Sequence, residues 1–152
     1  MSEIKQIVSM RLENTKREQV QALATRLYVR ESDLYRFAVA YLISKLEHIM
    51  DSSHVGSELL PLLLELREEI NSHLNIKKHQ LFKIVNSGHT PPDKFVAMAD
   101  IELLLMPQHS LKQHLLKLGE RPKDSNDGEE WLKSYLYKKY DLSEPDALPD
   151  RI

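Results

Sequence analysis

The sequence has no cysteine, only four glycines, and no apolar run that approaches the roughly 18 residues needed to cross a bilayer. Without cysteine there is neither a disulfide framework nor a thiolate metal site. The four glycines stand at breaks between apolar segments, so there is no glycine-rich loop to hold a phosphate or a dinucleotide. The first residues lack the charged-then-apolar pattern of a signal peptide. These absences predict a cytoplasmic protein with no membrane segment and no cofactor.

Catalytic and metal-binding patterns are also missing. No serine lies in a nucleophile-elbow motif and no pair of carboxylates stands out by its spacing, so we predict no catalytic residue and no enzyme activity. The chain has seven histidines, but the pairs His48/His54, His73/His79 and His109/His114 are separated by six, six and five residues. Two ligands on one helix face need a spacing of three or four. We therefore predict no metal site.

Charge is distributed unevenly along the chain. The first 45 residues carry eight Lys/Arg against five Asp/Glu, whereas the remainder carries 13 against 18. A basic N-terminal segment on an acidic body is a pattern found in proteins that bind nucleic acid.

The stretch from residue 6 to residue 46 changes from strand-like to helical spacing, breaks once, and resumes as a second helix. Gln6 to Glu13 alternates as a β-strand does, with apolar side chains on one face and mainly polar ones on the other. The apolar face holds Val8, Met10 and Leu12, and the opposite face holds Ile7, Ser9 and Arg11. A capping box at Thr15 and Glu18 predicts the start of a first helix, and Ser32 is expected to cap a second one.

A single strand ahead of two helices has no pairing partner within the chain, and unpaired strand edges are unstable. A second copy of the chain would supply the missing strand, so the pattern predicts a dimer. The second helix is apolar on most of its sides, which also favours burial between two copies.

Helical spacing continues beyond residue 57 to the last amphipathic helix, which contains Trp131 and Leu136. We expect helices over 57–74, around 81–85, over 90–107 and over 110–118, with a loop at 120–128. The domain prediction is a DNA-binding and dimerisation domain at 1–50, a linker at 51–57, a helical domain at 58–140 and an acidic tail at 141–152.

The first third of the chain resembles the ribbon–helix–helix family of DNA-binding dimers. The resemblance covers about residues 5–46 and is carried by the strand at 7–12, the stripe from Val20 to Leu27, the serine-started second helix and its closing Ala38-x-x-Tyr41-Leu42. It implies a mainly α fold in which one strand per chain pairs across a two-fold axis and an all-helical domain follows. Where this family often has glycine between its helices, the chain has Tyr28.

The resemblance also implies three sets of functional residues. The base-contacting side chains would be Ile7, Ser9 and Arg11, of which arginine can donate two hydrogen bonds to guanine. Phosphate would be contacted by Ser32, Asp33 and Leu34 at the start of the second helix, with Arg30, Arg36, Lys5 and Lys16. The dimer core would contain Val8, Met10, Leu12, Leu23, Leu27, Leu34, Phe37, Ala38 and Tyr41.

The sequence therefore predicts a homodimer that binds double-stranded DNA at an inverted repeat, most simply a bacterial-type transcriptional regulator, with dimers of dimers on adjacent half-sites. Two alternatives keep the same N-terminal segment. One is an antitoxin or adaptor whose region 58–140 binds a protein partner. The other is an accessory protein for plasmid transfer or partition.

Overall fold

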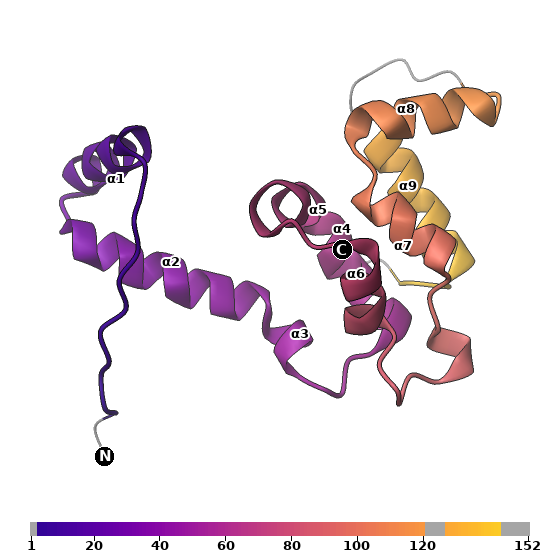
Figure 1. Cartoon of the computed structure of the whole chain (residues 1–152), viewed down its shortest axis with the longest axis horizontal. Coiled ribbons are helices and arrows are strands. Elements are labelled where there is room, and N and C mark those ends of the chain that lie inside the picture. The colour runs from indigo at the N-terminus through magenta and orange to yellow at the C-terminus, as the bar shows by residue number, and fades with distance from the viewer. Residues whose placement is uncertain (1–2, 121–126, 144–152) are drawn as a thin grey trace, which may run out of the picture. The chain divides into compact units, whose positions relative to one another are not determined.

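Helices account for all the regular secondary structure that this computed structural model describes, which covers residues 3–120 and 127–143. The chain divides into two units, Met1–Leu46 and Glu47–Ile152, which we call unit 1 and unit 2. Unit 1 consists of a segment without regular structure, residues 3–13, followed by α1 (Asn14–Leu27) and α2 (Glu31–Lys45) (Figure 1).

The predicted N-terminal strand is wrong. Residues 3–13 form neither strand nor helix, and no strand occurs in the described ranges. A strand exists only as part of a hydrogen-bonded ladder, and no other described segment of this chain supplies the second edge. The alternation of the sequence therefore does not place one set of side chains in a core and the other in solvent. Ile7 and Val8, expected on opposite faces of the strand, are both exposed, at 96% and 90%.

Both predicted helix caps are also wrong. The helix α1 begins at Asn14, because the backbone N–H of Arg17 donates to the carbonyl of Glu13 at 3.0 Å and closes the first turn ahead of Thr15. The helix α2 begins at Glu31 rather than after Ser32, and Arg30 occupies its N-cap position. The carboxylate of Asp33 accepts from the backbone N–H of Arg30 at 3.0 Å, so an aspartate in the third helical position caps this helix from inside.

Tyr28 ends α1 in the left-handed conformation, with φ of 58°. The backbone N–H of Val29 donates to the carbonyl of Ala24 at 3.0 Å, and that of Tyr28 donates to Thr25 at 3.3 Å. This is the hydrogen-bond pattern of a Schellman motif, in which glycine is the favoured residue at this position. The side chain of Tyr28 is 95% exposed, so no packing compensates for the backbone strain.

Replacing Tyr28 with glycine should therefore stabilise the protein. We expect Tyr28→Gly to raise the free energy of unfolding by about 1 kcal/mol, because glycine adopts positive φ without a Cβ clash. Tyr28→Ala is the matched control, since it removes the ring and keeps the Cβ. Thermal unfolding at one fixed protein concentration measures both variants, and equal midpoints for the two would contradict the strain.

Unit 2 is built from short helices. In chain order they are α3 (Glu47–Met50), η1 (Gly56–Leu59), α4 (Leu60–Glu65), α5 (Arg67–Glu69), the π-helical turn η2 (Ile70–Leu74), α6 (Lys78–Val85), η3 (Pro92–Lys94), α7 (Met98–Leu105), α8 (Gln108–Lys117) and α9 (Asp127–Lys139). Within this unit α6 contacts α7, α8 contacts α9, and α4 contacts α9 (Figure 1). In the described residues no helix combines the length and the apolar character needed to cross a membrane.

The core of unit 2 is apolar and fully formed. Its buried members are Leu59, Leu60, Leu63, Ile70, Leu81, Val85, Val96, Ile101, Leu103, Leu104, Leu111, Leu132 and Leu136. The predicted helix around 81–85 is confirmed as α6, and the one over 110–118 is confirmed as α8, which starts two residues earlier.

Two long helices predicted in this unit are wrong. The stretch 57–74 is divided into four short elements with a break at Leu66. The stretch 90–107 becomes the single turn η3 and then α7, because Asn86 holds the segment between them in an irregular conformation. The amide of Asn86 donates to the carbonyl of Val96 at 2.7 Å and accepts from its N–H at 2.9 Å.

The whole segment predicted as a linker, 51–57, lies inside unit 2, which begins at Glu47. Gly56 and Ser57 are buried, and Gly56 has φ of 59°. A Cβ added to Gly56 would lie 2.1 Å from the carbonyl oxygen of Lys94, so glycine is required where η1 meets η3. Residues 121–126 of the predicted loop and 144–152 of the predicted tail lie outside the described residues.

Candidate nucleic-acid interface

Unit 1 leaves most of its apolar side chains exposed. Ala24 is its one buried residue among those described. The exposed large apolar side chains are Ile4, Ile7, Val8, Met10, Leu23, Leu27, Tyr28, Val29, Phe37, Val39, Tyr41, Leu42 and Ile43. On α2 the rings of Phe37 and Tyr41 stack with centroids 6.1 Å apart, yet both remain more than half exposed. Two helices with such a surface lack the buried area that a stable fold needs.

The predicted dimer-core residues share this exposure. Val8, Met10, Leu23, Leu27, Phe37, Ala38 and Tyr41 are exposed, and Leu12 and Leu34 are half-buried. Further coverage of these side chains has to come from outside unit 1, and a second copy of the same surface is the simplest source. Their assignment to a dimer core stays a prediction.

Seven of the eight Lys and Arg side chains of unit 1, all except Lys45, fall into two groups. Lys5, Arg11, Lys16 and Arg26 are exposed and have no carboxylate partner within the described part of the chain. We call these four side chains the unpaired cations. Arg17, Arg30 and Arg36 are instead held by acidic residues at the start of α2. Arg26, in the last turn of α1, is not among the residues predicted from sequence. Its position next to an apolar stripe does not indicate whether folding brings a carboxylate close to it.

Asp33 is the centre of one acidic contact. Its Oδ2 accepts from the Nε of Arg30 at 3.2 Å, and its Oδ1 accepts from the Nη2 of Arg36 at 3.0 Å. Hydrogen bonds from the Arg30 side chain and backbone, with a further one from Arg36, lower the pKa of Asp33 to about 2. Asp33 is therefore ionised at any physiological pH.

Glu31 is the centre of the second acidic contact at the start of α2. Its Oε1 accepts from the hydroxyl of Tyr35 at 2.7 Å and from the Nε of Arg17 at 3.2 Å. These two hydrogen bonds, the one from Tyr35 first, lower the pKa of Glu31. The spacing of Glu31 and Tyr35, one helical turn apart, could have revealed the first contact, whereas the contact with Arg17 depends on how α1 packs against α2.

The N–H groups predicted to bind a phosphate are partly occupied. Those of Asp33 and Leu34 donate to the carbonyl of Arg30 at 3.0 and 3.4 Å. The Nη2 of Arg36 lies 3.4 Å from the hydroxyl oxygen of Ser32. The start of α2 is thus an internally bonded cluster, and its predicted contact with phosphate stays a prediction.

The predicted base-contacting side chains lie in the segment ahead of α1. Ile7, Ser9 and Arg11 are exposed. Their roles in contacting bases also stay predictions. Since the segment has no regular structure, what the three side chains share is accessibility and closeness along the chain, and Arg11 alone carries charge.

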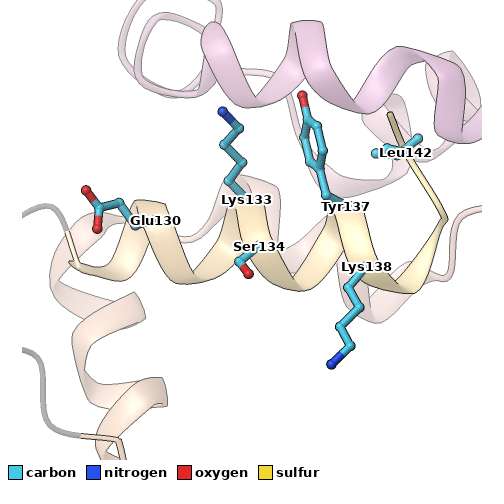
Figure 2. A pocket seen from close by; sticks show the side chains of 6 residues that line it. All are labelled: Glu130, Lys133, Ser134, Tyr137, Lys138 and Leu142. Atoms are coloured by element: carbon cyan, nitrogen blue, oxygen red, sulfur yellow. The ribbon is translucent and has the colours of Figure 1, made fainter. Parts of the chain in front are cut away.

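Unit 2 offers a second candidate, a cavity of about 460 Å³ along α9. It is lined by Glu130, Lys133, Ser134, Tyr137, Lys138 and Leu142. Figure 2 shows Lys133 and Tyr137 extending from one side of α9 while Lys138 extends from the other. Because these polar groups diverge, they do not converge on one ligand as the groups of a binding site do. Unit 1 is therefore the stronger candidate.

Two of the seven histidines, His48 and His54, lie side by side. The rings of His48 and His54 stack with centroids 4.2 Å apart, and the Nε2 of His54 lies 3.7 Å from a carboxylate oxygen of Asp51. Within the described ranges no three His, Asp or Glu side chains are arranged to hold a metal ion.

Comparisons with protein-family models, with curated proteins and with solved structures find no match to this chain. The resemblance of residues 5–46 to ribbon–helix–helix proteins remains a prediction from sequence. The exposed apolar surface and the unpaired cations of unit 1 are the physical features from which a function can be inferred.

Proposed function

We propose that this protein is a homodimer that binds DNA sequence-specifically through unit 1 and regulates transcription. The observation that carries the proposal is the surface of unit 1, which combines an uncovered apolar face with cations that have no acidic partner. The apolar face supports self-association. The unpaired cations support binding to a polyanion.

The apolar face of unit 1 is more stable when it is covered by a second copy of the chain than when it is exposed to water. Fully burying a large apolar side chain contributes about 1.5–3 kcal/mol, so covering the half-exposed ones contributes roughly 1 kcal/mol each. Leu23, Leu27, Phe37, Leu42 and Ile43 are all about half exposed or more. Two such surfaces related by a two-fold axis form a self-complementary interface.

The unpaired cations supply the electrostatic part of DNA binding. Phosphate contacts dominate the affinity of DNA-binding proteins and make it depend on salt, whereas base contacts provide the specificity. In a dimer the four unpaired cations become eight, and a two-fold axis implies an inverted-repeat binding site. Arg11 is the side chain best suited to a base contact, because a guanidinium group can donate to both O6 and N7 of guanine.

Selection of bound sequences from a pool of random DNA duplexes tests this function. We expect an inverted repeat to be enriched by the full-length protein. Arg11→Ala should lower the preference for that sequence over random DNA by about 10- to 100-fold for each bidentate base contact that is lost, and the dimer loses one in each subunit. Lys5→Ala, the control, should weaken binding to all sequences alike.

The proposal would be contradicted if the full-length protein enriched no sequence from the pool, or if Arg11→Ala kept the sequence preference of the wild type. Circular dichroism and sedimentation of each variant show that fold and assembly are retained.

A further inference from the structure

The first turn of α2 concentrates opposite charges. Two carboxylates, those of Glu31 and Asp33, bind three guanidinium groups within 3.2 Å. The three arginines are Arg17, Arg30 and Arg36. All three remain well exposed, with 62%, 79% and 66% of their side chains accessible, so the contacts are made on the surface of the unit.

Asp33 makes the densest contact of the cluster. Its two oxygens accept four hydrogen bonds, three from Arg30 and one from Arg36. The single negative charge of Asp33 thus offsets half of the combined charge of Arg30 and Arg36. The hydrogen bonds also hold each guanidinium group in one orientation toward the carboxylate. Glu31 acts in the same way on Arg17, and its second partner, Tyr35, is neutral.

We propose that these two carboxylates form a charge lock, which lowers the affinity of the protein for DNA phosphates. The lock consists of Arg17, Arg30, Glu31, Asp33 and Arg36, and it rests on the proposed function of unit 1. With three cations and two anions the lock carries a net charge of +1 instead of +3. Phosphate binding is left mainly to the four unpaired cations.

The lock changes where the free energy of DNA binding comes from. Binding to random DNA is almost entirely electrostatic, whereas specific binding adds base contacts. Fewer available cations weaken both modes of binding, so base contacts supply a larger share of the free energy of binding to the specific site. Arg30 and Arg36, which the sequence suggests as phosphate contacts, instead serve in this lock.

A matched pair of charge-neutralising variants tests the lock. Asp33→Asn and Glu18→Gln each remove one negative charge from unit 1, but Glu18 is exposed and has no ion-pair partner in the described residues. Asparagine retains an oxygen that can accept from the backbone N–H of Arg30, so the helix keeps its cap. The probes are a phosphocellulose column, eluted by salt, and a random-sequence DNA duplex.

We expect Asp33→Asn to elute from phosphocellulose at clearly higher salt than Glu18→Gln. Its affinity for random duplex should rise by about 10-fold, and its dependence of affinity on salt should steepen by about one more phosphate contact per chain. Glu18→Gln should change the affinity for random duplex by about 2-fold. Equal shifts in the two variants would overturn the lock.

A second pair keeps the test decisive if Asp33→Asn unfolds. Arg36→Gln removes a locked cation and Arg26→Gln removes an unpaired one, with the same change in net charge. The lock requires the loss of affinity for phosphocellulose to be at least about threefold smaller for Arg36→Gln than for Arg26→Gln, because Asp33 already offsets part of the charge of Arg36. Equal losses would overturn it.

The two proposals fail separately. If the wild-type protein selects no DNA sequence while Asp33→Asn still exceeds Glu18→Gln on phosphocellulose, the DNA-binding function fails and the lock holds. If an inverted repeat is selected and the matched variants behave alike, the function holds and the lock fails.

Discussion

Replacing Asp100 with alanine is expected to destabilise unit 2 by about 3 kcal/mol, because it removes the acceptor at the centre of a buried polar cluster. Asp100 lies on α7 and has no exposed surface. The hydroxyl of Tyr135 donates to its Oδ1 at 2.9 Å, and the hydroxyl of Tyr140 donates to its Oδ2. The ammonium group of Lys139 lies 2.8 Å from the same Oδ2.

The cluster joins the start of α7 to the end of α9. The hydroxyl oxygen of Tyr140 also accepts from the backbone N–H of Ala97 at 3.0 Å, so each donor in the cluster has a partner. Alanine would leave two half-buried phenols and one ammonium group without their acceptor, and it would also leave a small void. Loss of one buried charge partner is among the larger effects that a single substitution produces.

Urea unfolding monitored by the fluorescence of Trp131 measures this effect. Trp131 is the only tryptophan of the chain and stacks on Tyr135 at 5.2 Å, so it reports on the region of the cluster. Asp93→Ala is the control, because Asp93 is exposed and should change stability by less than about 0.5 kcal/mol. A similar unfolding midpoint for the two variants would show that the cluster contributes little.

The same cluster should also make unit 2 sensitive to alkali. Burial, and then the hydrogen bond to Asp100, raises the pKa of Tyr140 to about 12, and the hydrogen bond to Asp100 raises the pKa of Lys139. A raised pKa stabilises the fold while the group keeps its proton, so this contribution is complete below about pH 10 and is lost as the pH rises toward 12. Unfolding followed across that range should show the loss in the wild type and a smaller loss in Tyr140→Phe.

Placing a charge in the apolar face of α2 is expected to dissociate the protein into monomers. Phe37 is 66% exposed and stacks on the exposed ring of Tyr41, so both rings belong to the uncovered apolar surface of unit 1. Phe37→Asp would bury an unpaired carboxylate in each half of a two-fold interface. The dissociation constant of the dimer should therefore rise by about 100-fold or more.

Sedimentation equilibrium over a range of protein concentrations measures the dissociation. Leu118→Asp is the matched control, because Leu118 is 56% exposed in unit 2 and receives the same new charge outside the proposed interface. We expect the control to remain dimeric. A Phe37→Asp variant that stays dimeric, or a wild type that is monomeric at high concentration, would show that α2 does not form the interface.

DNA binding should fall together with dimerisation. A dimer places two copies of the unpaired cations on one duplex, and a monomer loses half of these contacts and the fixed spacing between them. Phe37→Asp should therefore lose binding to the selected inverted repeat while unit 2 keeps its unfolding midpoint. If a monomeric variant still bound that repeat tightly, the link between assembly and binding would be absent.

The sequence by itself determined where several helices of this protein lie. The one-sided stripe from Val20 to Leu27 and the apolar run that begins at Leu34 correspond to α1 and α2, and the apolar positions of 81–85 correspond to α6. A helix makes its hydrogen bonds within four residues, so its presence can be predicted from local spacing. The uneven charge of the chain and the absence of cysteine are likewise properties of the sequence alone.

Only the tertiary structure decided the features that depend on distant partners. The alternation at 7–12 predicted a strand, but a strand needs a second edge and this chain supplies none in its described residues. Asp100 meets tyrosines 35 and 40 residues further along the chain, and no local pattern marks them as its partners. The tertiary structure also decides which cations of unit 1 are unpaired. A carboxylate forms an ion pair with those arginines that folding brings within about 4 Å. At the start of α2 this depends on the local fold of the helix and on how α1 packs against it.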